Sequence, residues 1–256
     1  FNNQTPDNLY VHHNATTGKD KIKTNEIGNS NVNSPSLQAP LNYHTRGLIE
    51  GENLLSAGKI DTAIKLFEEQ VHVEPNSADA HFYLGLGRQL KGDFDRSIES
   101  YNRAINLNSE FGIAYNNIGS VYREIGDLVS AITCFQKSTL LLPDNYFPYY
   151  NLGVALADKA DDENDLPTAL RSLKVGLQIK ADLADAIVYQ YSLYSRMCDW
   201  QSLYINHQSI PSLGTGEQEV SPFLILHLDD HPGRQHRRAE IYAKNKFNHV
   251  ALEPNA

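Results

Sequence analysis

Small, aromatic and glycine residues recur every 34 positions through the middle of the chain. Ala63, Ser97 and Ala131 keep this spacing, and so do one aromatic column and two glycine columns. These further columns are Phe67, Tyr101 and Phe135, then Gly51, Gly85 and Gly119, and then Gly58, Gly92 and Gly126. Four columns with one period predict a chain built from stacked copies of a single supersecondary unit, in which each copy buries its apolar face against the next.

Each unit contains two apolar stripes at helical spacing, separated by a turn such as Gly92-Asp93 or Gly126-Asp127. We place the first glycine column and the small residues where the two helices of a unit cross, because only small side chains let the backbones approach closely. The aromatic residue four positions later fills the gap toward the next unit. Pro75 and Pro143 are expected to end second helices, since proline lacks the N–H that a helix interior needs.

These columns resemble the tetratricopeptide repeat, whose pattern falls on Gly119, Ala131, Phe135 and Pro143 in the third unit. The resemblance implies an all-α fold, a tetratricopeptide-repeat superhelix in which helix pairs form an α-α solenoid. The second unit departs from the pattern at Ser97 and Ser109. The first unit departs at Gly47 and Glu50, where large apolar residues are usual, so we expect its opening helix to be frayed or to act as a cap.

The chain divides into three regions by composition. Residues 1–40 contain eight asparagines and no apolar period, so we expect a disordered tail. Residues 41–183 hold four repeats, at about 43–77, 78–111, 112–145 and 146–183, and the fourth has four extra residues in the acidic loop 159–167. We interpret that loop as a solvated turn and not a calcium site. Residues 184–256 are expected to form a half-repeat helix and a helical junction, with a last helix over 231–246.

Composition excludes several classes of function. The chain has 22 Lys and Arg against 31 Asp and Glu, and 20 of the acidic residues lie in 41–183, so nucleic-acid binding is not expected. No apolar run approaches the roughly 18 residues of a membrane span, so no membrane association is expected. The only cysteines, Cys134 and Cys198, cannot build a disulfide framework, which fits a cytoplasmic location.

The end of the repeat region resembles the junction between repeats and catalytic region in the O-GlcNAc transferase family, including its SPINDLY-like members. The resemblance rests on Ala184-Asp185-Ala186, Cys198-Asp199-Trp200 and Ser221-Pro222-Phe223. It implies a parent protein that is a UDP-GlcNAc-dependent protein O-glycosyltransferase, whose C-terminal glycosyltransferase domain would be a partner of the repeats. The sequence lacks a start Met and stops about where that domain would begin, so we expect a fragment without activity and without a cofactor.

Two further clusters carry possible chemistry. His227, Asp229, Asp230, His231 and His236 could ligate zinc or iron if they converged, but neighbouring helix positions do not share a face, so we interpret them as a solvated helix start and assign no metal. Arg234, Arg237 and Arg238 form a basic patch facing solvent or the missing domain. No nucleophile–base arrangement is present in the sequence, so no catalytic residue is assigned.

We expect function on the inner face of the superhelix, where extended peptides or proteins would bind. Asn117 and Asn151 share one inward-facing column and resemble the asparagine ladder with which O-GlcNAc transferases hold substrate backbone, since an amide can both donate and accept. The alternative is that each asparagine satisfies a neighbouring helix. The candidate groove residues are Asn117, Asn151, Asn116, Tyr83, Phe82, Arg123 and Tyr150.

The sequence therefore predicts a protein–protein interaction module. Our first hypothesis is the substrate-presenting repeat region of a protein O-glycosyltransferase. The alternatives are a stand-alone tetratricopeptide adaptor and a repeat region attached to an unrelated enzyme.

Overall fold

The computed structural model describes residues 43–206 and 232–247, and every regular element in these ranges is a helix. The expected tail, residues 1–40, lies outside the described residues. By contacts the chain divides into two compact units, Phe1–Val121 and Tyr122–Ala256, and each is described by itself. Within the described ranges, no helix is long and apolar enough to cross a membrane.

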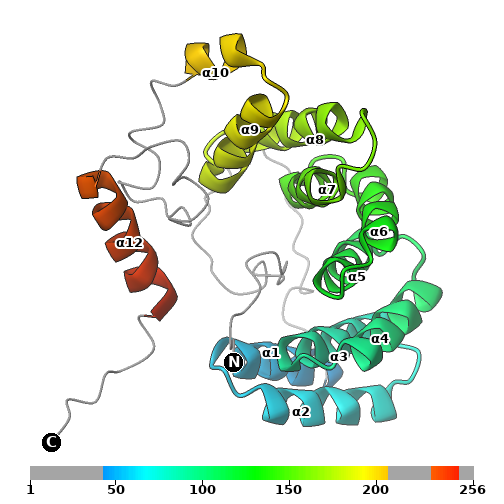
Figure 1. The fold of residues 1–256 in the computed structure, drawn as a ribbon. Coiled ribbons are helices and arrows are strands. Elements are labelled where there is room, and N and C mark those ends of the chain that lie inside the picture. Colours follow the sequence, from blue (N-terminus) through cyan, green and yellow to red (C-terminus); the bar gives the residue numbers. More distant parts are fainter. Residues whose placement is uncertain (1–42, 207–231, 248–256) are drawn as a thin grey trace, which may run out of the picture. The chain divides into compact units, whose positions relative to one another are not determined.

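The first unit is built from helix pairs that pack side by side (Figure 1). Helix α1 (Tyr43–Ser56) packs on α2 (Ile60–Val73), and α3 (Ala78–Lys91) packs on α4 (Phe94–Leu107). Helix α5 (Gly112–Glu124) begins here and ends in the second unit. The turn after α3 favours glycine because Gly92, which caps the end of that helix, adopts the left-handed conformation with φ 81°.

The second unit repeats the same pairing. Its helices are α6 (Leu128–Leu141), α7 (Tyr146–Lys159), α8 (Asp165–Ile179), α9 (Ala184–Arg196), the short α10 (Trp200–Asn206) and α12 (Pro232–Phe247). Phe135, Leu152, Leu173 and Leu193 bring α6 to α9 into one buried cluster. The expected last helix is confirmed, and its Pro232 occupies the first turn, where a missing N–H costs nothing.

The glycines of the first column lie directly under the aromatic or large residue of the second helix. A Cβ added to Gly85 would lie 2.8 Å from Cδ1 of Tyr101, and one added to Gly153 would lie 2.7 Å from Cγ of Leu173. Both distances are shorter than a carbon–carbon contact allows. The helices of a repeat can therefore approach this closely only over glycine, as the column predicted.

The departures of the first repeat from the pattern led us to expect a frayed or capping opening helix, and of these two possibilities fraying is not observed in the described part of the chain. Helix α1 is 14 residues long, and Gly47 is buried because the side chain of Gln70 lies over it, 2.5 Å from where a Cβ would be. In the fourth repeat the sizes are exchanged, since Tyr149 on the first helix packs over Gly176 on the second. One large and one small residue share this position, and which helix provides the large one can vary.

The long acidic loop is held by one carboxylate. Asp165 at the start of α8 accepts hydrogen bonds from Lys159 Nζ at 2.8 Å and from the backbone N–H groups of Asp161 and Asp162 at 3.0 Å each. The bond from Lys159 and these amides hold the pKa of Asp165 below its ordinary range. The loop is therefore a structured turn that closes on its own acidic residues, and helix α8 begins two residues before Pro167, inside the segment expected to be loop.

We predict that Gly85→Ala destabilises the first unit, because the added methyl group would collide with the ring of Tyr101, which is fully buried and cannot move aside. Overpacking of this kind costs about 1–3 kcal/mol of unfolding free energy, measurable by urea denaturation followed by circular dichroism. Ser109→Ala in an exposed turn is the control and should leave the midpoint unchanged. An unchanged midpoint for Gly85→Ala would contradict the assigned helix crossing.

Candidate functional site

Phe82, a predicted groove residue of the first unit, belongs to the core. It is only 1% exposed, and its ring lies 5.0 Å from Phe111, 5.4 Å from Tyr83 and 5.7 Å from Tyr101 between centroids. These tilted and edge-on contacts are the arrangement that aromatic rings prefer in a packed interior. Phe82 therefore stabilises the repeat and presents no free face to a partner.

Tyr83 is half-buried at the side of this aromatic cluster. Its ring stacks on Phe67 at 5.5 Å, and its hydroxyl group is hydrogen-bonded to Glu52. Burial, followed by the negative charges of Glu52 and Asp79, raises the pKa of Tyr83. The phenol thus stays protonated and acts as a hydrogen-bond donor at any physiological pH.

The asparagines of the predicted ladder are buried. Asn116 and Asn117 are 1% and 0% exposed, and Asn151 in the second unit is 2% exposed. Asn117 Nδ2 lies 3.5 Å from the hydroxyl group of Tyr101, which itself donates to Gln89 Oε1 at 2.9 Å. For Asn117 these contacts favour the structural interpretation, in which the amide satisfies polar groups of neighbouring helices.

Arg123 and Tyr150 lie in the second unit, close to polar side chains that are partly exposed to solvent. Arg123, near the end of α5, donates from Nε to Asp158 Oδ2 on α7 at 2.9 Å. The two side chains are 27% and 40% exposed, so the pair lies partly in solvent and is not a buried ion pair. An ion pair in such a position contributes little to stability, and both side chains keep some solvent-exposed surface.

Two residues of α9 complete this group. The ring of Tyr189 meets the ring of Tyr150 edge to face, with centroids 6.0 Å apart. Burial raises the pKa of Tyr150, and the nearby carboxylate of Asp185 raises it further. We call Arg123, Tyr150, Asp158, Asp185 and Tyr189 the α7–α9 patch.

Arg123 and Tyr150 were predicted from the sequence, whereas Asp158, Asp185 and Tyr189 were not. A signal was present for the two α9 residues, because Asp185 and Tyr189 occupy the repeat positions of Asp79 and Tyr83, displaced by the four-residue insertion. Phenol, carboxylate and guanidinium groups together can donate and accept hydrogen bonds and can receive a cationic side chain on a ring face. The α7–α9 patch therefore has the chemistry of a polypeptide-binding surface.

The Cys-Asp-Trp motif forms the turn between α9 and α10. Asp199 Oδ1 accepts from the backbone N–H of Ser202 at 3.1 Å, the contact of a helix N-cap, and Cys198 adopts a positive φ of 56°. Trp200 is 60% exposed. Of the considered metal cluster, His227, Asp229, Asp230 and His231 lie outside the described residues, and within the described ones no group of three metal-ligating side chains is found.

Models of tetratricopeptide repeats match three stretches of the chain. A model described as TPR repeat matches residues 90–126, and two models described as tetratricopeptide repeat match residues 113–145 and 50–86. These matches span the second half of α1, all of α2, most of α3, and α4, α5 and α6.

Curated relatives of several kinds are similar to the repeats of this chain. A BBSome complex member BBS4 homolog of Drosophila melanogaster is 23% identical over 142 residues, 55% of this chain and 28% of that protein. A probable peptide N-acetylglucosaminyltransferase SPINDLY of Oryza sativa is 35% identical over 60 residues, 23% of this chain and 6% of that protein. Human mitochondrial import receptor subunit TOM70 is 29% identical over 82 residues, 32% and 13% respectively. The chain spans less than a third of the length of these relatives.

Solved structures show the same architecture at low identity. The structure of PilF from Pseudomonas aeruginosa has a TM-score of 0.63 and 18% identity, and covers 82% of this chain and 94% of its own. A MamA structure from Desulfovibrio magneticus RS-1 has a TM-score of 0.59 and 15% identity, and covers 68% and 97%. Together with the repeat matches and the helix pairs, this likeness fixes the fold. The helix pairs of this chain have the fold of a tetratricopeptide-repeat solenoid.

Proposed function

We propose that this repeat region binds extended protein segments and that the α7–α9 patch is a principal contact surface. The repeats themselves imply a protein–protein interaction module. The observation that supports the surface is the partly exposed Arg123–Asp158 pair beside the two tyrosine rings, since it offers donors, acceptors and an aromatic edge together. Such a mixture can bind the peptide backbone with little dependence on sequence.

We further propose that the bound segments are substrates presented to a protein O-glycosyltransferase domain, as the family resemblance of the junction implies. The 35% sequence identity over 60 residues with the SPINDLY protein of Oryza sativa supports this interpretation. The Cys198-Asp199-Trp200 turn, which carries the resemblance at the junction, supports it as well. A cytoplasmic location belongs to the same proposal. The adaptor alternative is supported by the BBS4 homolog, because that similarity extends over more of this chain.

The two functions can be separated by the reading frame downstream of Ala256. If the repeats present substrates in the same chain, that frame encodes alternating strand and helix patterns with a glycine-rich phosphate-binding turn. A frame that encodes only more repeats, or that ends, would contradict the transferase proposal and leave the adaptor. The protein-binding proposal is tested independently by variants of the patch.

For the patch we predict that the double variant Arg123→Ala with Asp158→Ala binds an unfolded, reduced and alkylated test protein about tenfold more weakly, because hydrogen-bonding anchors of an interface are lost. Removing both members avoids leaving one charge unpaired. The matched control removes an exposed Glu163 and an exposed Arg171 from the neighbouring loop and helix. Fluorescence anisotropy measures the affinity. Equal affinities for the two double variants would exclude the patch.

For the asparagine column we predict that Asn117→Ala lowers the unfolding free energy by about 1–2 kcal/mol, because a buried amide that contacts the Tyr101 hydroxyl is lost. Binding of the same unfolded test protein should stay within about twofold, since interactions with neighbouring helices do not reach a ligand. Chemical denaturation and anisotropy give the two values. Weaker binding with unchanged stability would instead support the ladder.

A further inference from the structure

An open groove lies on the first unit between α2, α3 and α4. It encloses about 630 Å³, a volume within the range of ligand-binding clefts. Val71 provides partly exposed apolar surface inside it, and Leu84, which is only 4% exposed, closes its base. Asn102, Arg103 and Asn106 from α4 form an exposed polar side of the groove. The groove therefore combines an apolar base with polar walls that are exposed to solvent.

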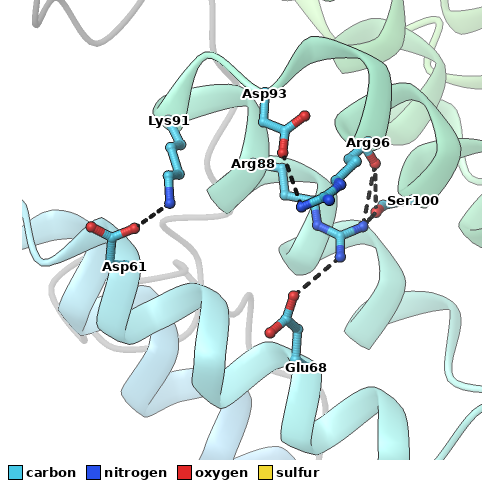
Figure 2. Close-up of polar contacts among 7 residues, drawn as sticks. All are labelled: Asp61, Glu68, Arg88, Lys91, Asp93, Arg96 and Ser100. Atoms are coloured by element: carbon cyan, nitrogen blue, oxygen red, sulfur yellow. Dashed lines mark hydrogen bonds and ion pairs between the residues drawn. The ribbon is translucent and has the colours of Figure 1, made fainter.

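Arg88 on α3 is held in a fixed position on the groove (Figure 2). One of its guanidinium nitrogens donates to Ser100 Oγ on α4 at 2.8 Å, and the other donates to Glu68 on α2 at 3.1 Å. Ser100 is 3% exposed, whereas the side chain of Glu68 is 50% exposed. Arg88 thus links three helices and contributes a pre-positioned cation, partly matched by a carboxylate at the surface.

Arg103 differs from Arg88 because its guanidinium group is bonded to none of the residues that the structure describes. Within the described residues it forms no ion pair or hydrogen bond, although Glu99 lies one turn earlier on the same helix. Asn102 and Asn106, one turn apart on either side of it, likewise keep their amide groups unbonded among those residues. His81, also on the groove, is engaged through Nε2 with the carbonyl group of Pro75 at 3.0 Å. The available donors are therefore gathered on α4.

The charged side chains that line the groove are mainly basic, whereas those of the whole repeat region are mainly acidic. Two guanidinium groups and one carboxylate line it, whereas residues 41–183 have 13 basic and 20 acidic side chains. A free guanidinium flanked by two amides matches a carboxylate, which accepts the strong, charge-assisted hydrogen bonds that arginine donates. The amides can in addition bind the backbone of an extended segment.

We propose that this groove docks an acidic peptide segment of a partner protein, with a carboxylate on Arg103 and a neighbouring apolar side chain on Val71. The groove uses residues of α2 and α4 that lie outside the inward-facing columns, and the α7–α9 patch belongs to the other unit. It is therefore a second docking surface, independent of the proposed function, and either can fail without the other.

The test uses the full chain and three short fluorescein-labelled peptides in which leucine alternates with glutamate, glutamine or lysine. The glutamate peptide should bind at least about tenfold more tightly than the glutamine peptide. The variant Arg103→Gln should reduce the affinity for the glutamate peptide to that of the glutamine peptide. The matched control is Arg96→Gln, which removes an exposed arginine of the same helix outside the groove and should bind like the unmodified chain.

Three results would overturn the proposal: no saturable binding of the glutamate peptide, equal binding of the glutamine peptide, or equal losses for the Arg103 and Arg96 variants. Because Arg103 is exposed and bonds to no described residue, its replacement should leave the circular dichroism and the melting midpoint unchanged. The double variant Arg123→Ala with Asp158→Ala should retain full affinity for the glutamate peptide. If it lost that affinity, the acidic peptide would bind at the α7–α9 patch and not in this groove.

Discussion

The close crossing of two helices over a glycine is the contact on which the rest of the structure depends. Phe67, Tyr101 and Leu173 each lie against a glycine of the preceding helix, at distances that leave no room for a Cβ. Because the aromatic or large side chain is enclosed there, it is fully buried and fixed in direction. The hydroxyl of Tyr101 then points at Gln89 and Asn117, so even the buried polar contacts of the first unit follow from this crossing.

The same principle accounts for departures from the repeat pattern. The pairs Gly47 with Gln70 and Tyr149 with Gly176 fill the same space with the large residue on opposite helices. A dense interior requires that the total volume be conserved and does not fix which helix supplies it. The first-helix column alone therefore did not predict that α1 is a regular, packed helix, whereas the two facing columns together account for its packing.

The two proposed binding surfaces arise in different ways. The α7–α9 patch collects residues from three helices, and only two of its five members were predicted from the sequence. Asp158 lies outside the inward-facing repeat positions, and the four-residue insertion displaces Asp185 and Tyr189 from the 34-residue period. The groove between α2, α3 and α4 was not foreseen at all. Its residues have no shared repeat column, and a cation such as Arg103 becomes distinctive only when its neighbours are seen to leave it unbonded.

The sequence by itself determined the period, the helix pairs, their glycine turns and the fold class, because these depend on local backbone preference and on the size of side chains at a crossing. The tertiary structure decided which polar side chains are accessible. Asn117 and Arg123 both occupy inward-facing repeat positions, yet one is fully buried and the other is about a quarter exposed. Accessibility depends on what packs over a residue from elsewhere in the chain, and periodicity along one helix carries no information about that covering.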